Sequence, residues 1–107
     1  MPKYLYQGSY SPDGVMGLMK DTAAGRRAAV KAGIKSAGGK MECMYFSLGT
    51  DDVMAIMDLP DNIAAARLAA TIAASGMVSG SLTPLLTLEE MDKALSKSAN
   101  YKAPGEA

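Results

Sequence analysis

The stretch MECMYFSLGTDDVMAIMDL, residues 41–59, decides the fold of this chain. It contains two runs of strand-forming residues, 41–48 and 53–59. The four residues between them, Gly49-Thr50-Asp51-Asp52, are turn formers, so the stretch predicts a β-hairpin.

Both strands of this hairpin are apolar on both sides. Because successive side chains of a strand point to opposite faces, alternation gives two sets for each run. The first run divides into Met41, Cys43 and Tyr45 against Met44, Phe46 and Leu48, and the second into Val53, Ala55 and Met57 against Met54 and Ile56. In a sheet with one solvent-exposed face, apolar and polar residues alternate along each strand. These strands lack that alternation, so something is expected to cover each face.

The remaining elements follow from local signals on either side of the hairpin. Tyrosines alternate along the first strand, and Ser11-Pro12-Asp13 is typical of a helix start. The middle of that helix contains residues that disfavour a helix interior, so we expect a kink near Gly25. The two glycines Gly38-Gly39 are expected to end it. A capping box, Thr87 to Glu90, begins the last helix. The predicted strands are 3–10, 41–48, 53–59 and 77–86, the last at an edge or with a bulge, and the predicted helices are 12–37, 63–75 and 88–98.

This order, β-α-β-β-α-β with a C-terminal helix, predicts an α+β, ferredoxin-like domain over residues 1–98 with a loosely ordered tail at 99–107. Right-handed crossovers place both main helices on one face of the sheet. The chain has too few residues left to cover the other face. We therefore expect a homodimer, or a higher oligomer, in which two sheets pack together as a dimeric α+β barrel.

Composition excludes several classes of function. The chain has 107 residues, 49% of them hydrophobic, and its 11 basic residues balance 11 acidic ones. This balance offers no basic surface for nucleic acid. Without histidine and with only Cys43, the chain lacks the residues for a zinc site, a catalytic triad or a Cys-His pair. We expect no metal and no cofactor, and Cys43 is interpreted as a small buried hydrophobe.

No secretory signal and no apolar run of about 20 residues is evident, so we expect a cytoplasmic protein without a membrane partner.

Several local strings resemble the GYD-domain family of small bacterial proteins. The similar strings are PKYLYQGSY (2–10), GRRAAV (25–30), GGK (38–40), YF (45–46), LPDN (59–62), ASG (74–76) and TPLLTLEEM (83–91). The motif that names the family, Gly-x-Tyr-Asp, appears here as Gly49-Thr50-Asp51-Asp52, with Asp51 in place of the tyrosine. The resemblance implies a dimeric α+β barrel but no established activity, because relatives with this fold include cofactor-independent monooxygenases, muconolactone-type isomerases and ligand sensors.

Two kinds of residue are candidates for a binding site. Arg26 and Arg27 could hold a carboxylate or phenolate at the sheet edge, although a solvated helix face explains them as well. Tyr6, Tyr10 and Tyr45 could line a small apolar pocket, although core packing is the more common fate of such residues. No residue is assigned a catalytic role.

Asp51 and Asp52 are explained by the chemistry of the turn, and Asp52 is expected to bind backbone amides or an arginine. Two hypotheses follow. The chain either binds a small aromatic or anionic ligand in a pocket, with monooxygenase-like or isomerase-like chemistry, or it is a non-catalytic sensing or protein-interaction module. An enzyme without histidine would need a tyrosine, lysine or carboxylate with a shifted pKa as its base.

Overall fold

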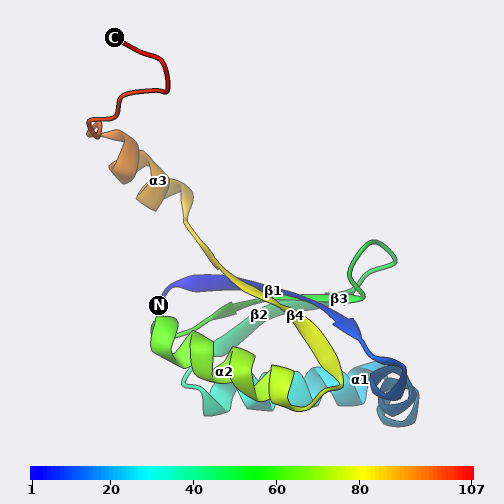
Figure 1. The fold of residues 1–107 in the computed structure, drawn as a ribbon. Coiled ribbons are helices and arrows are strands. Elements are labelled where there is room, and N and C mark those ends of the chain that lie inside the picture. Colours follow the sequence, from blue (N-terminus) through cyan, green and yellow to red (C-terminus); the bar gives the residue numbers. More distant parts are fainter.

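The computed structural model describes residues 1–107 and contains the seven elements in the predicted order (Figure 1). The first strand has the predicted ends, and the ends of the other elements differ from the sequence prediction by at most three residues; for example, the second strand stops at Phe46, and Leu48 lies in the loop. The elements are β1 (Lys3–Tyr10), α1 (Pro12–Ser36), β2 (Lys40–Phe46), β3 (Val53–Asp58), α2 (Asn62–Ala74), β4 (Val78–Leu85) and α3 (Leu88–Leu95).

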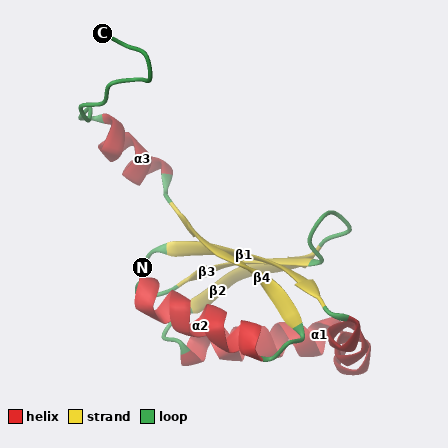
Figure 2. Cartoon of the chain, viewed as in Figure 1, coloured by secondary structure: helices red, strands yellow, loops and turns green.

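The four strands form one antiparallel sheet in the order β2-β3-β1-β4. Helices α1 and α2 cover the same face, and α3 stands away from them on the other side (Figures 1 and 2). This is the strand order expected for the β-α-β-β-α-β arrangement. Strand β4, which contains Gly80 and Pro84, lies at an edge, where a missing ladder hydrogen bond is tolerated.

A β-bulge changes which side chains of β2 face the helices. Met41 pairs with Met57, but the next pair is Cys43 with Ile56, so Glu42 is the extra residue. The alternation predicted from the sequence, with Met41 on the side of Cys43 and Tyr45, is therefore wrong. Met41 is buried under the helices, whereas Cys43 shares the helix-free face with Ile56 and is half-buried there, not fully buried.

The helix-free face is apolar only on one half. Its apolar residues come mostly from β2 and β3, and we call them the open-face patch: Leu5, Cys43, Tyr45, Met54 and Ile56. The half formed by β1 and β4 is mainly polar, with Gln7, Ser9, Ser79, Ser81 and Thr83, and its apolar residue on β4 is Leu85 at the end of the strand. The expectation of a fully apolar face rested on the hairpin alone and is wrong for the half formed by β1 and β4, where the polar residues need no apolar cover.

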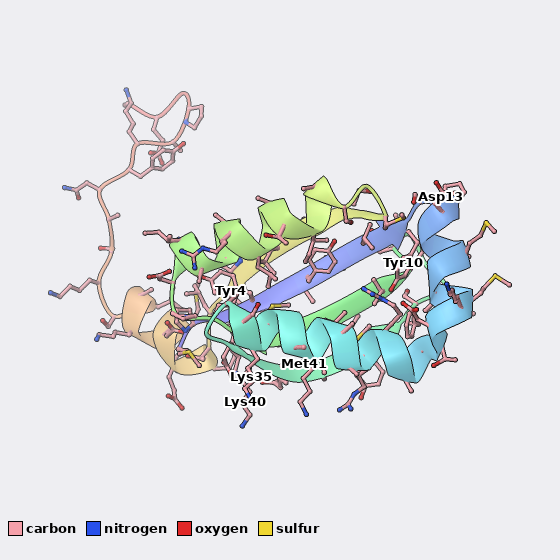
Figure 3. The ribbon with its side chains drawn as sticks, turned by 90° about the horizontal axis from the view of Figure 1, so that it is seen from below. Tyr4, Tyr10, Asp13, Lys35, Lys40 and Met41 are labelled. Carbon is pink, nitrogen blue, oxygen red and sulfur yellow. The ribbon has the colours of Figure 1, made fainter.

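Helix α1 is bent at Thr22, three residues before the predicted position at Gly25. Thr22 has φ 71° and ψ 164°, far from helical values. Its hydroxyl accepts a hydrogen bond from the Gly25 N–H at 3.2 Å, so Thr22 acts as the N-cap of the second part of the helix. The two parts run in different directions (Figure 3).

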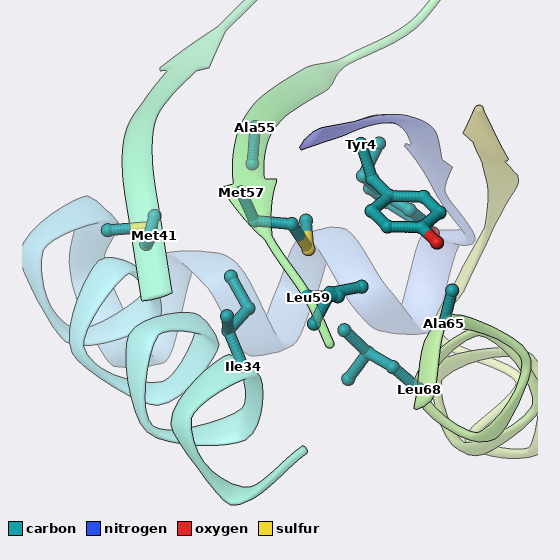
Figure 4. Packing of buried hydrophobic residues seen from close by; sticks show 9 residues of the cluster. Tyr4, Ile34, Met41, Ala55, Met57, Leu59, Ala65 and Leu68 are labelled. Atoms are coloured by element: carbon teal, nitrogen blue, oxygen red, sulfur yellow. The ribbon is translucent and has the colours of Figure 1, made fainter. Parts of the chain in front are cut away.

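The core lies between the helices and the sheet (Figure 4). Leu59 and Ile34 are almost completely buried, at 0% and 1% exposure. Only 13 of the 107 residues are buried, which is a small core for a chain that folds alone. The main buried cluster comprises Tyr4, Tyr6, Ile34, Met41, Ala55, Met57, Leu59, Ala65 and Leu68.

Helix α3 makes the molecule elongated. Its capping box forms as predicted, because the Thr87 hydroxyl accepts from the Glu90 N–H and the Glu90 carboxylate accepts from the Thr87 N–H. None of its residues is buried. The radius of gyration is 17.2 Å, against about 13 Å for a compact chain of this length. None of the helices is long and apolar enough to cross a membrane.

Candidate small-molecule site between the helices and the sheet

A cavity of about 190 Å³ lies between α1, α2 and the helix-covered face of the sheet. Twelve of its fifteen lining residues are hydrophobic. The polar atoms that meet it come from few side chains, chiefly Tyr6, Tyr10 and Arg26, which were among the candidates from the sequence. The remaining lining residues are Ala29, Val30, Gly33, Ile34, Met44, Val53, Ala55, Met57, Leu68, Thr71, Ile72 and Val78.

Tyr6 reaches the cavity from the middle of β1. The residue is 8% exposed, and its hydroxyl group is buried without a hydrogen-bond partner. A buried hydroxyl normally has a partner, because leaving it unpaired costs about 1–3 kcal/mol. The Tyr6 hydroxyl is therefore an unpaired donor on a residue that lines an apolar cavity.

Two glycines make room for this phenol. Gly8 and Gly80 are directly opposite each other on β1 and β4. A Cβ on Gly8 would lie 2.6 Å from the Tyr6 ring, and a Cβ on Gly80 would lie 2.7 Å from the Tyr6 hydroxyl oxygen. Larger residues at either position would push the ring away. Only the register of β1 and β4 reveals that the two glycines form a cross-strand pair against the Tyr6 ring.

The surroundings of Tyr6 keep its phenol protonated. Burial raises the pKa of Tyr6, and the neighbouring Tyr10 and Asp51 raise it further. Burial disfavours the charged phenolate because a low-dielectric environment solvates it poorly. Tyr6 therefore acts as a hydrogen-bond donor at neutral pH, which is the opposite of what a general base requires.

Arg26 supplies the second free donor, from the second part of α1. Its Nε atom is buried without a partner, while its Nη1 atom lies 3.8 Å from a carboxylate oxygen of Asp21. The bend at Thr22 separates these two residues and sets which way the following turn faces. Arg27, the next residue, is exposed and does not line the cavity. The structure thus distinguishes two arginines that the sequence could not.

A second hollow, of about 320 Å³, adjoins the cavity near the first part of α1. Tyr10 and Arg26 line both spaces, so they stand at the boundary between them. The outer hollow also contains Asp13 and Asp21, which makes it more polar than the inner cavity. Figure 3 shows Tyr10 beside the first part of α1.

The other candidates from the sequence lie elsewhere. Tyr45 is 65% exposed and belongs to the open-face patch, on the far side of the sheet from the cavity. The Asp52 carboxylate accepts a hydrogen bond from the Tyr10 N–H at 2.9 Å, and Asp51 lies 3.5 Å from the Ser9 hydroxyl. The Gly49 N–H donates to the Ser47 hydroxyl. The turn motif therefore holds the end of β1 and does not enter the cavity.

The side chains do not form a cluster of metal ligands. No group of three or more His, Cys, Asp or Glu residues is placed to hold an ion. The nearest approach to a charged cluster is Lys3, which pairs with Glu42 at 2.6 Å and Asp58 at 2.9 Å. These contacts raise the pKa of Lys3 and satisfy both carboxylates locally.

Comparison with known proteins connects the chain to one family. The family model described as "GYD domain" matches residues 4–95, which include the sheet except Lys3, all three helices and every residue of the cavity. A comparison with curated proteins finds no match, and neither does a comparison with solved structures.

Proposed function

We propose that this chain, which belongs to the GYD domain family, is a homodimeric protein that binds one small molecule per subunit between its helices and its sheet. One observation supports this proposal most directly. Two residues that line a largely apolar cavity, Tyr6 and Arg26, each carry a buried donor, the Tyr6 hydroxyl and the Arg26 Nε–H, that has no partner in the chain. A ligand with an acceptor oxygen would supply the missing partner.

The chemistry of the cavity defines the ligand class. Both free groups are donors, and the guanidinium carries a positive charge, so the matching group is an anionic oxygen such as a carboxylate or phenolate. The other walls favour an apolar body. A cavity of about 150 Å³ accepts benzene in another protein, so 190 Å³ corresponds to one substituted aromatic ring.

Ligand sensing is favoured over catalysis by the residues that line the cavity. Its ionisable side chains are Tyr6, Tyr10 and Arg26, and none of its residues is a carboxylate, lysine or histidine. The pKa of Tyr6 is raised, so this phenol does not serve as a base. The two donors could stabilise an oxyanion in monooxygenase-like or isomerase-like chemistry, but a substrate would have to lose its proton to another group.

The open-face patch supports the proposed dimer. Its members include Met54 and Ile56 on β3 and the 65%-exposed Tyr45 on β2. A second copy placed over the helix-free face would bury these side chains and produce a dimeric α+β barrel. Sedimentation at micromolar concentration tests this part separately, and a stable monomer would contradict it.

The binding proposal is tested by calorimetry with benzoate, phenol and toluene. Benzoate is expected to bind more tightly than toluene, which has the ring without the acceptor. Arg26→Met keeps the stem and removes the guanidinium. Loss of a charged hydrogen bond is expected to weaken benzoate binding by about ten- to hundredfold, and Tyr6→Phe by about two- to tenfold.

Two matched variants control this experiment. Arg27→Met removes the neighbouring exposed guanidinium, and Tyr45→Phe removes a hydroxyl outside the cavity. Both are expected to bind benzoate like the unchanged protein. If Arg27→Met weakened binding as much as Arg26→Met, or if none of the three probes bound, the assignment of the cavity would be wrong.

A further inference from the structure

Helix α3 has an apolar stripe of which no residue is buried in its own chain. Leu88, Met91 and Leu95 are spaced three and four residues apart, so they lie on one side of the helix. They are 86%, 44% and 68% exposed, and Leu86 just before the helix is 65% exposed. Lys93 lies on the opposite side. An amphipathic helix of eight residues is not stable by itself, so a surface that meets this stripe is needed.

The helix stands on the same side of the sheet as the open-face patch. Figure 1 shows α1 and α2 on one side of the sheet and α3 on the other, beyond the end of β4. A second copy placed over the helix-free face would therefore occupy the space beside α3. The two unpartnered apolar surfaces of the chain would both meet that copy.

The helix-free face of the sheet is too small to supply the whole interface of a stable dimer. Four strands spaced by about 4.8 Å, each of about seven residues, give a footprint of about 450 Å² per copy. Half of this face is polar. Two such faces bury about 900 Å², whereas stable interfaces bury about 1,600 Å² in total. An exposed apolar helix from each copy would add surface where the sheet provides too little.

Folding back onto its own patch is a poorer solution for α3. The helix follows β4, at one edge of the sheet, after a connection of only two residues, Leu86 and Thr87. The patch lies mainly on β2 and β3, toward the opposite edge. The helix would have to reverse direction at once and cross the polar half formed by β4 and β1.

We propose that α3 is an exchanged arm, whose stripe of Leu88, Met91 and Leu95 packs against a second copy of this chain. This inference rests on the proposed dimer and adds the C-terminal helix of each copy to its interface. It does not depend on the ligand in the cavity. The two arms would hold the sheets together from outside, and the pairing of the sheets would be incomplete without them.

Photo-crosslinking of the full chain tests the partner of the stripe. Met91 is replaced by p-benzoylphenylalanine, and Lys93 carries the same group in a control. Irradiation is expected to give a product of twice the chain mass from position 91 and much less from position 93. Mass spectrometry separates links between chains from links within one chain. A link within one chain, or no link at position 91, would overturn the proposal.

A pair of charge substitutions tests the contribution of the stripe to the dimer. Leu88→Glu changes both arms and is expected to raise the dissociation constant of the dimer by about 100-fold or more, because two buried leucines are lost. Glutamate in the first turn suits the helix, so the helix itself is retained. Lys93→Glu is the control and is expected to change the constant less than threefold.

The outcomes separate this inference from the proposed function. A dimer whose dissociation constant is the same in Leu88→Glu and Lys93→Glu would refute the exchanged arm and leave the sheet pairing intact. An unchanged protein that sediments as a monomer would refute both the sheet pairing and the arm. Neither result would alter the benzoate experiment, which concerns the cavity alone.

Discussion

The bend in α1 can be tested at Thr22, where the backbone adopts a conformation that is almost restricted to glycine. With φ 71° and ψ 164°, a β-branched residue at this position is strained by about 1–3 kcal/mol. Thr22→Gly removes this strain. Two effects oppose this gain in stability. Loss of the hydroxyl cap costs a few tenths of a kcal/mol when glycine replaces threonine, and the greater conformational freedom of glycine in the unfolded chain costs about 0.5–1 kcal/mol. The net expectation is a free energy of unfolding about 1 kcal/mol higher.

Thr22→Ala is the matched comparison, because alanine retains the strain and loses the cap. It is expected to lower the free energy of unfolding by about 1 kcal/mol. Urea denaturation at one fixed protein concentration measures both variants, with an unchanged m value as the sign that only stability has changed. The two midpoints should differ by about 2 kcal/mol in stability. Equal midpoints for glycine and alanine would refute the strained bend.

The remaining predictions concern the ring of Tyr6 and the glycines around the sheet. Because burial raises the pKa of Tyr6, the phenol ionises more easily in the unfolded chain. The stabilisation that comes from the raised pKa of Tyr6 is complete below about pH 10 and is lost as the pH rises above that value. In urea titrations between pH 9 and 11, the free energy of unfolding of Tyr6→Phe should therefore fall less with pH than that of the unchanged protein. Gly80→Ala places a methyl group against the Gln7 carbonyl and the Tyr6 hydroxyl, and should lower stability by about 1–3 kcal/mol. Gly17→Ala in α1 meets open space and should raise it by about 0.5–1 kcal/mol, so equal effects of the two substitutions in thermal unfolding would contradict the packing at Gly80.

Local signals predicted the elements of this fold well. Ser11 accepts from the Gly14 N–H, Asp61 accepts from the Ala64 N–H, and Thr87 forms its capping box, each at a predicted helix start. Such caps act over three residues, so they can be read without knowing the fold. Three of the five candidate binding residues, Tyr6, Tyr10 and Arg26, line the cavity.

Orientation was much harder to predict than position along the chain. Arg26 and Arg27 are neighbours with the same chemistry, and the bend at Thr22 decides which of them faces the sheet. The side of Met41 depends on a bulge at Glu42, which only pairing with β3 reveals. Tyr45 looked equivalent to Tyr6 as an aromatic strand residue, yet it lies on the other face.

The amino-acid sequence alone determined the order of strands and helices, because propensities, caps and turn residues act over a few neighbours. Tertiary structure decided which buried donors lack a partner, since the Tyr6 hydroxyl and the Arg26 Nε are buried beside the cavity only after β1, β4 and the bent α1 have packed together. It also decided that α3 stands apart with an uncovered stripe. A helix can be predicted from local residues, but the absence of a surface against it depends on where every other element lies.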